Sequence, residues 1–328
     1  MENEVETIAV VIVNFNGGAF LSNCLSAVYN QSSPATRVVI VDNGSSDGSV
    51  DRLSEKYPDI ELIKAEGNLG FARANNLAIN SVEDCHWLAL LNPDTVPSKD
   101  WLSDLRQGIN QYPDTKMFSC RLVCLDNEET LDGTGDHYHV SGLVWRRDHG
   151  SLSNIVRNPD EEIFSPCGAA ALYDMSLVKK LGGMDDHYFC YNEDVDLAFR
   201  MRLKGASCVH LDHCIVKHKG SGITGSESDF TVYHGHRNLV WTFFKNMPGS
   251  MLWLYLPQHI LMNLITIVLY TFKGRGRVIV RSKWDALLGL PRVLRQRRAI
   301  QESKTVENSE VKSAMITAPF AYFSRHRY

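Results

Sequence analysis

The chain has 328 residues, of which 44% are hydrophobic and 22% are charged. This length allows one large domain or two modest ones, and this composition excludes an intrinsically disordered chain. The formal net charge of −4 argues against nucleic acid as the main partner, although nine Lys and Arg stand against one Asp between Lys273 and Arg298.

Strands and helices alternate over the first hundred residues. β-branched and apolar runs predict strands at 8–14, 36–43, 60–65 and 87–92, and helical spacing predicts helices at 17–31, 45–57 and 70–81. This alternation is typical of an α/β domain with a mainly parallel sheet covered by helices on both faces.

Three of the predicted strands end in polar residues, namely Asn14, Asp42-Asn43 and Asn92-Pro93-Asp94. Ligands of parallel sheets bind beyond the carboxyl ends of the strands, so these residues favour a polar pocket there. A tight turn is the alternative explanation for each ending, because Asn, Pro and Asp are common turn formers.

The pattern is mixed between 117 and 216 and then becomes helical. Strands are predicted at 117–125 and 167–174, and Val195, Phe199 and Leu203 predict a helix that begins at 192–194 and ends at Gly205. From Phe230 onward the chain is helical and aromatic, whereas the tail 301–328 has no periodicity and is expected to be disordered.

The eight cysteines are scattered and form no CxxC pair, which favours reduced thiols over a metal cluster. The first seven residues are acidic and do not resemble a secretory signal. We therefore expect a cytoplasmic protein.

Six short stretches occur in a specific order: VIVNFNGG, VIVDNGSSDGS, EGNLGFARANN, LLNPDT, CGAAALYD and YNEDVDLAFR. In this order they resemble the family 2 glycosyltransferases with the GT-A fold, in particular the rhamnosyltransferase-like branch that carries N-P-D. The resemblance covers about residues 8–248 and implies that 1–248 form a nucleotide-sugar glycosyltransferase domain.

The resemblance implies that Asp42 accepts a hydrogen bond from a pyrimidine N3–H, which suits a UDP- or dTDP-sugar. Asn14, Asn16 and Asn43 would line the base and ribose pocket. A turn role remains the alternative for these residues, because DNGSSDG is favourable turn chemistry.

Asn68, Gly70, Arg73 and Asn76 lie around the start of the predicted third helix. A helix N-terminus accommodates anions through its free N–H groups and its dipole, so the donor diphosphate is expected here, with Arg73 adding a positive charge. The alternative for Arg73 is a solvated side chain on an exposed helix.

Asp94 is the expected ligand of a divalent cation, Mg²⁺ or Mn²⁺, because hard oxygen ligands suit these ions. Many relatives carry D-x-D here, whereas Asn92 replaces the first Asp and would contact the donor ribose instead. The resemblance assigns His218 as a second metal ligand; a purely structural His is the alternative.

The resemblance assigns Asp194 as the general base of an inverting transfer, with Glu193 as its supporting neighbour. A simple helix cap is the alternative for Asp194. Asp196 fits better as the i,i+4 partner of Arg200.

Small residues at 168–171 leave room for a sugar, so Gly168 and Ala169 are candidates for acceptor binding. Tight strand packing explains them equally well. Arg237 matches a further family element that meets phosphate or acceptor.

Residues 250–272 carry no charge and are long enough to span a bilayer, but they include Pro257, Gln258, His259 and Asn263. With the basic stretch that follows, we interpret 249–300 as a helical segment that attaches to the cytoplasmic face of the inner membrane. A core helix and a transmembrane span are the alternatives.

The sequence thus predicts an inverting, metal-dependent glycosyltransferase that moves a sugar, with rhamnose from dTDP-rhamnose as the first candidate, onto a cell-surface polysaccharide or lipid-linked glycan. A non-catalytic sugar-nucleotide sensor or assembly scaffold is the rival, and nucleotidyl transfer is disfavoured because the loop after the first strand lacks a basic residue. No stretch specifies the linkage or the oligomeric state.

Overall fold

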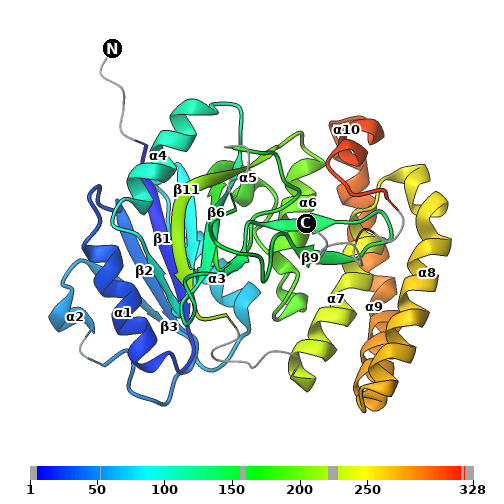
Figure 1. Cartoon of the computed structure of the whole chain (residues 1–328), viewed down its shortest axis with the longest axis horizontal. Coiled ribbons are helices and arrows are strands. Elements are labelled where there is room, and N and C mark those ends of the chain that lie inside the picture. Colours follow the sequence, from blue (N-terminus) through cyan, green and yellow to red (C-terminus); the bar gives the residue numbers. More distant parts are fainter. Residues whose placement is uncertain (1–5, 52, 156–159, 221–227, 319–320, 322–328) are drawn as a thin grey trace.

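The computed structural model describes residues 6–51, 53–155, 160–220, 228–318 and 321. A central sheet lies at one side of the molecule, and a group of long helices stands at the other side (Figure 1). The sheet contains the strands in the order β3-β2-β1-β4-β10-β6-β11-β5, and β7 pairs with β6. Their bounds are β1 Ile8–Asn14, β2 Arg37–Asp42, β3 Ile60–Lys64, β4 Trp87–Leu91, β5 Thr95–Pro97, β6 Met117–Cys124, β7 Leu131–Gly133, β10 Ala170–Asp174 and β11 Cys208–His218.

Helices cover both faces of the sheet, as the alternating sequence predicts. Along β1, Ile8, Val10 and Ile12 face the core under α1 and α4, whereas Ala9 and Val11 face the core under α3, α5 and α6. Successive side chains of a strand point to opposite faces, so a strand buried on both sides is apolar throughout. The helix bounds are α1 Gly18–Tyr29, α3 Phe71–Ser81, α4 Trp101–Gln111, α5 Met175–Lys180 and α6 Glu193–Arg202.

The helix predicted over 45–57 is wrong for most of its length, because among the residues described in this stretch only α2, Leu53–Lys56, is helical. Upstream of it, Gly44 and Gly48 have positive φ values of 82° and 73°. Asp47 accepts hydrogen bonds from the backbone N–H groups of Ser49 and Gly18. Asp and Ser side chains that bond nearby backbone groups compete with a helix, so this stretch forms turns.

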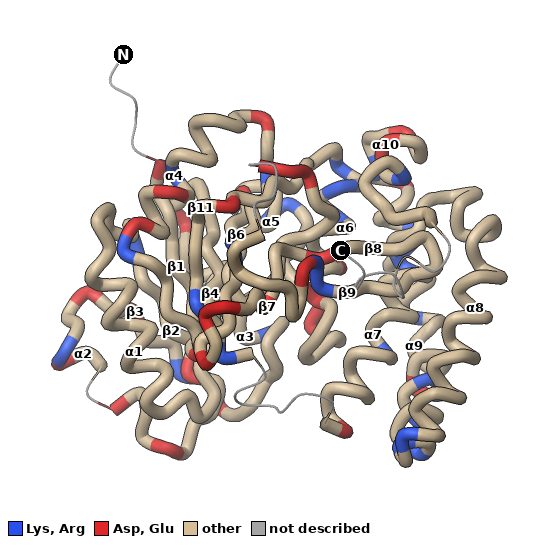
Figure 2. The backbone as a smooth tube through the Cα atoms, viewed as in Figure 1, with Lys and Arg blue, Asp and Glu red and all other residues tan. Residues whose placement is uncertain are grey.

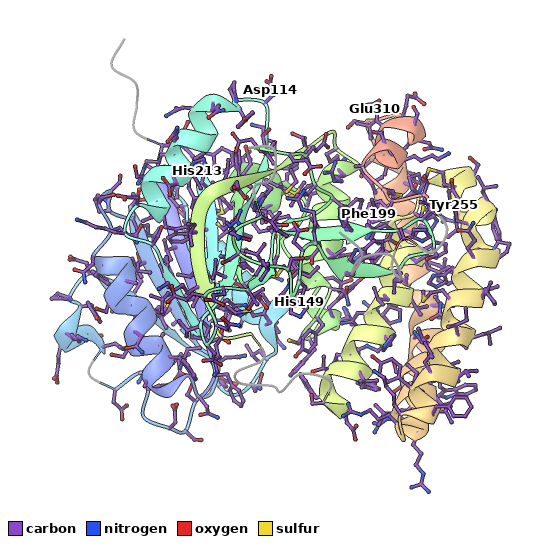
Figure 3. The ribbon with its side chains drawn as sticks, viewed as in Figure 1. Asp114, His149, Phe199, His213, Tyr255 and Glu310 are labelled. Carbon is purple, nitrogen blue, oxygen red and sulfur yellow. The ribbon has the colours of Figure 1, made fainter. Side chains whose placement is uncertain are left out.

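The chain beyond β7 adds a small hairpin, a short 3-10 helix and three long helices. The hairpin consists of β8, Asp136–Tyr138, and β9, Val144–Arg146, and the 3-10 helix η1 covers Asp186–Tyr188. The long helices are α7, Asp229–Asn246, α8, Gly249–Phe272, and α9, Gly276–Glu302, which lie side by side in Figure 1. Aromatic and aliphatic side chains of α6, α7 and α8, among them Phe199 and Tyr255 (Figure 3), form a separate core with β8.

The expectation of a disordered tail is wrong for residues up to 318 of the described chain. α9 continues to Glu302, and α10, Asn308–Ser313, follows with a capping box in which Glu307 and Glu310 each bond the other's backbone. Val311 is buried against the α7–α8 core, and Ile316 exchanges backbone hydrogen bonds with Tyr138 and Val140. This short segment is ordered because it packs against the rest of the protein. No local periodicity in its sequence predicts that packing.

Candidate active site

Parallel strands bring remote parts of the chain to one edge of the sheet. β1 pairs in parallel with β2 and β4. β4 and β6 both pair antiparallel with β10, so β6 and its parallel neighbour β11 run in the same direction as β4. Their carboxyl ends therefore share one edge, which carries Asn14, Asp42, Asp94 and His218.

A cavity of about 730 Å³ opens at this edge. Its walls come from the strand ends, the segment 189–195 and α7, and His149, labelled near the centre of Figure 3, contributes to it. Most of the predicted site residues line this cavity: Asn43, Asn68, Gly70, Asn92, Asp94, Gly168, Ala169, Glu193, Asp194 and His218.

Asp94 and His218 face each other in the cavity. His218 Nε2 lies 3.4 Å from Asp94 Oδ1, and both side chains are buried. Oδ1 of Asp94 and Oδ1 of Asn92 are buried and accept no hydrogen bond from the described part of the chain. A carboxylate oxygen and an imidazole nitrogen at one point are a suitable donor set for a divalent cation, so the residues present fit the predicted metal.

His218 also contacts a second carboxylate. Its Nδ1 lies 2.7 Å from Asp132 Oδ2. Burial alone lowers the pKa of His218, but Asp132 and Asp94 outweigh burial and raise that pKa above its ordinary value. The imidazole thus sits between two acidic groups, where a positive charge is favoured.

Asp194 is held at the start of α6. Its Oδ2 accepts a hydrogen bond from Gly168 N–H at 2.8 Å, and its Oδ1 accepts one from Val195 N–H at 2.8 Å. A Cβ added to Gly168 would lie 3.0 Å from Asp194 Oδ2, so the absence of a side chain at Gly168 leaves room for the Asp194 carboxylate. The small residue that was predicted to make room for a sugar therefore also makes room for Asp194.

The acidic groups around Asp194 have elevated pKa values. Burial raises the pKa of Asp194, and burial followed by the neighbouring Asp194 raises the pKa of Glu193 well above its usual range. Burial, and next the charge of Asp194, raise the pKa of Asp136 to about 7. Asp136, Cys167 and Asp194 have ligand-type atoms within 4.8 Å of one another, so these two carboxyl groups and a thiol share one small space.

Asn43, Asn68 and Gly70 form one wall of the cavity. Asn43 Nδ2 donates to Asn68 Oδ1 at 3.1 Å, and Asn43 Oδ1 accepts from Leu69 N–H at 2.8 Å, which ties the end of β2 to the loop before α3. Gly70 has a φ of +80°, and a Cβ there would lie 2.6 Å from Phe189. The glycine lets the two loops meet.

Asn14, Asn16 and Asp42 lie beside the cavity but do not line it. Asn14 donates to Ser45 Oγ and Ser49 Oγ, Asn16 Oδ1 accepts from Ser46 N–H, and Asp42 Oδ1 accepts from Ser45 N–H. These contacts are turn chemistry, the alternative that the sequence left open.

Arg73 and Asn76 do not line the cavity either. Arg73 is exposed and makes no hydrogen bond or ion pair with the residues that the structure describes. Asn76 donates to Met184 O and Asp186 Oδ1 and accepts from Met184 N–H, so its amide fixes the segment before η1. It lines a second cavity, separate from the first.

Arg237, predicted to meet phosphate or acceptor, is buried in a structural role. It donates to the carbonyl oxygens of His187 and Tyr188, and its guanidinium lies 4.2 Å from the Trp241 ring centroid. The next residue, Asn238, donates to the carbonyl oxygens of Tyr188, Cys190 and Tyr191. This pair fixes the loop that leads into Glu193 and Asp194.

The sequence did not identify Asp132, Asp136 and Arg146, which line the cavity from β7, β8 and β9. Their stretch reads LDGTGDHYHV, in which three-residue strands leave no detectable periodicity. The two Asp residues around Gly-Thr-Gly were the only local signal, and this pattern also describes an ordinary turn.

Comparison with known proteins now adds to this geometry. A family model described as Glycosyl transferase family 2 matches residues 9–182. The chain is 23% identical over 242 residues to the N-acetylglucosaminyl-diphospho-decaprenol L-rhamnosyltransferase of Mycobacterium tuberculosis, covering 68% of this chain and 79% of that protein.

Two solved structures share the fold. TarS 1-349 of S. aureus in complex with UDP-GlcNAc aligns with a TM-score of 0.60 at 15% identity, over 94% of this chain and 90% of that one. The mannosyltransferase PcManGT of Pyrobaculum calidifontis, solved with GDP-Man and Mn²⁺, aligns with a TM-score of 0.54 at 16% identity, over 94% and 85%. The family match, the related enzyme and the shared GT-A fold together show that the chain belongs to glycosyl transferase family 2 and is a glycosyltransferase.

Proposed function

We propose that this enzyme transfers a sugar from a nucleoside diphosphate to a glycan hydroxyl, with inversion at the anomeric carbon. The observation that carries the proposal is that Asp94, His218 and Asp194, from three remote parts of the chain, line one cavity. Inversion requires the leaving group and the attacking hydroxyl on opposite faces of the sugar, which a cavity with two separate functional clusters supports.

Asp94 and His218 would hold a divalent cation, Mg²⁺ or Mn²⁺. Such a cation, when bound, neutralises negative charge on the leaving diphosphate. Asn92 Oδ1, which has no partner in the described structure, offers a polar contact to the donor in the same cavity. The Mn²⁺ in the PcManGT structure supports a divalent cation for this fold.

Asp194 would take the proton from the acceptor hydroxyl. The N–H groups of Gly168 and Val195 fix the orientation of its carboxylate, and the raised pKa makes it a stronger base than a solvated Asp. Burial, and next the charge of Asp194, raise the pKa of Glu193 well above its ordinary value, which favours the neutral form of Glu193 beside the base.

The donor that we propose is a dTDP- or UDP-sugar, with dTDP-rhamnose as the first candidate. Asp42 Oδ2 makes no hydrogen bond or ion pair within the described chain, so it is available to a pyrimidine N3–H. TarS, solved with UDP-GlcNAc, supports a pyrimidine donor, and the mycobacterial rhamnosyltransferase supports rhamnose.

The acceptor that we propose is a lipid-linked glycan at the cytoplasmic face of the inner membrane. The mycobacterial relative is named for a diphospho-decaprenol acceptor. In this chain, large apolar side chains are exposed along α8 and α9, including Trp253, Leu264, Phe272, Trp284, Leu287 and Leu288. Exposed apolar side chains that gather on one pair of helices are typical of a protein or membrane interaction site.

Basic residues accompany this apolar surface. Lys273, Arg275, Arg277 and Arg281 lie at the turn between α8 and α9 and in the first turns of α9. Figure 2 shows Lys and Arg positions in blue at the lower end of this helical pair. Basic groups next to an apolar face complement an anionic leaflet, each contributing about 1 kcal/mol near the surface. This charge complementarity supports a lipid bilayer as the occupant.

Attachment to the surface fits the structure better than a transmembrane span does. By length and composition alone, α8 is able to cross a membrane. One side of α8 nevertheless packs on the protein, because His259 stacks on Phe243 with ring centroids 3.9 Å apart, and one of its ring nitrogens, Nδ1, hydrogen-bonds Ser141 O at 2.7 Å. A helix held on one side presents only its other side to lipid.

The substitution Asp194→Asn tests the proposed function. The full-length enzyme with Mn²⁺, anionic vesicles and a polyprenyl-diphosphate-GlcNAc acceptor is incubated with dTDP-rhamnose, UDP-GlcNAc or GDP-mannose, and release of nucleoside diphosphate is measured. We expect turnover with dTDP-rhamnose in the wild type and a loss of about 10²–10⁴-fold in the variant, because a general base contributes that much. The donor should still bind, as a shift in melting temperature reports.

Asp174→Asn is the matched control, because Asp174 also accepts a backbone hydrogen bond at a helix start but lies outside the cavity. It should keep its turnover. Equal turnover of wild type and Asp194→Asn would contradict the assigned base, and donor binding without transfer by the wild type would favour the sensor.

A further inference from the structure

Asp132 is the most enclosed carboxylate next to the Asp94–His218 pair. It lies on β7 with 4% of its surface exposed. Besides His218 Nδ1 at 2.7 Å, it forms an ion pair with Arg146, and its backbone oxygen lies 2.9 Å from His149 Nδ1. A Cβ on Gly220 would lie 3.1 Å from Asp132 Oδ1, so the chain closes tightly around this carboxylate.

The contact with Asp132 determines which nitrogen of His218 is available. A carboxylate accepts hydrogen bonds but cannot donate one, so Nδ1 must carry the proton in this pair. In the neutral imidazole Nε2 then holds the lone pair, and Nε2 is the nitrogen that faces Asp94 Oδ1. Metal-binding His residues are commonly oriented by a carboxylate in this way.

We propose that Asp132 is a positioning residue that fixes the tautomer and ring orientation of His218, so that Nε2 and Asp94 Oδ1 together are pre-organised for a divalent cation. This inference rests on the cation site of the proposed function. It adds a residue from a different strand, one for which neither the sequence nor the family resemblance gave a role.

A purely structural role is the competing explanation, because Asp132 also anchors β9 through Arg146. The two roles differ in their dependence on His218. If Asp132 acts through His218, removing Asp132 should weaken cation binding only while His218 is present. If Asp132 only anchors the hairpin, its loss should act independently of His218.

Direct titration of the metal-free, full-length protein with Mn²⁺ distinguishes the two roles. Free Mn²⁺ is followed by electron paramagnetic resonance at a fixed neutral pH, without nucleotide, and circular dichroism melting checks that each variant is folded. We expect Asp132→Ala to weaken Mn²⁺ binding by about 10–100-fold. Asp132→Asn should weaken it less, because an amide oxygen still accepts from Nδ1–H.

The double variant Asp132→Ala/His218→Ala should bind Mn²⁺ no more weakly than His218→Ala alone. Asp212→Asn is the matched control: Asp212 pairs with Arg121 and lies 3.5 Å from His210 Nε2 on β11, but it does not line the cavity. The Asp212→Asn variant should bind Mn²⁺ as tightly as the wild type does.

Two results would overturn the inference: a folded Asp132→Ala variant that binds Mn²⁺ like the wild type, or additive losses in the double variant. Because binding is measured without any transfer reaction, neither result depends on the identity of the sugar donor or acceptor. If the transfer assay fails but Mn²⁺ still binds in a way that depends on Asp132, the proposed function is contradicted and the role of Asp132 is not.

Discussion

At the scale of single residues, the buried carboxyl groups of the cavity differ in how readily they ionise. Asp194 accepts two backbone N–H bonds that favour its ionised form, whereas Asp136 has no such donors among its described contacts and has a pKa of about 7. Burial, and next the charge of Asp194, favour the protonated form of Asp136. The backbone donors thus favour Asp194 over Asp136 as the ionised group.

The raised pKa of Asp136 predicts a pH-dependent effect of Asp136→Asn on stability. Between about pH 4 and pH 7 the folded wild type binds a proton that the unfolded chain has lost, so its free energy of unfolding falls as the pH rises. In Asp136→Asn the side-chain amide does not titrate, so this loss of stability with rising pH is absent. The variant should therefore gain stability over the wild type across this range, by at most about 4 kcal/mol above pH 7.

Urea denaturation at several pH values between 4 and 8 measures this gain. Asp114→Asn is the control, since Asp114 is exposed after the end of α4 (Figure 3), and a substitution at such a surface position should change stability by less than about 0.5 kcal/mol. A stability difference for Asp136→Asn that is the same at pH 4 and pH 8 would contradict the raised pKa.

At the scale of elements, buried ionic contacts hold α6, α7 and the η1 segment together. Asp196 on α6 is fully buried and accepts hydrogen bonds from Arg200, from Lys245 at 2.9 Å and from Asn246 at 2.8 Å. Lys245 also bonds Asp185, just before η1, at 2.7 Å. The predicted Asp196–Arg200 helix pair is confirmed, but it is one part of a larger network that fixes the helix carrying Asp194.

Removal of Asp196 should be strongly destabilising. In Asp196→Ala the ammonium group of Lys245 and the guanidinium of Arg200 lose a buried partner, and breaking a buried ion pair on one side typically costs about 3–5 kcal/mol. The measurement is the free energy of unfolding in urea.

Asp84→Ala provides the comparison for this prediction. Asp84 pairs with Arg37 at 2.8 Å, but its side chain is 69% exposed, so its loss should have a much smaller effect. Equal effects of the two substitutions would show that the Asp196 network contributes no more than a surface pair.

At the scale of the whole molecule, the catalytic domain and the α8–α9 pair form one packed body with two different surfaces. α9 packs on α7 through Ala286 and Val293, and Lys283 donates to His236 O. Arg292 of α9 also contacts Asp185, so the helical pair is connected to the segment that leads into α6. A bilayer at α8–α9 would thus lie against the same body that holds the cavity.

Charged substitutions on the exposed face should release the protein from membranes. Leu264 and Leu288 are 55% and 63% exposed, and Leu264→Glu/Leu288→Glu places two carboxylates where we propose lipid contact. Co-sedimentation with anionic vesicles should fall by at least about tenfold, because apolar burial is lost and each Glu repels the anionic surface.

Leu152→Glu is the matched control, since Leu152 is 59% exposed and pairs with Thr130 rather than belonging to α8 or α9, and it should sediment like the wild type. Unchanged binding by the double variant would contradict the proposed surface. Wild-type protein that resists extraction from membranes by alkaline carbonate would instead indicate a transmembrane span.

The sequence by itself determined the α/β architecture, because strand and helix periodicity are local. It also determined the edge of the sheet that carries the site, because the carboxyl ends of parallel strands meet at one edge. It therefore predicted that Asp94 lies at the same edge as Asn14 and Asp42, and the family resemblance added Glu193, Asp194 and His218 to this site. Only the tertiary structure decided that Arg237 and Asn76 hold loops, that Asp132 and Asp136 enter the cavity, and that residues 308–316 are ordered. Those outcomes depend on side-chain contacts between segments far apart in the chain, and such contacts leave no periodic signal in the sequence.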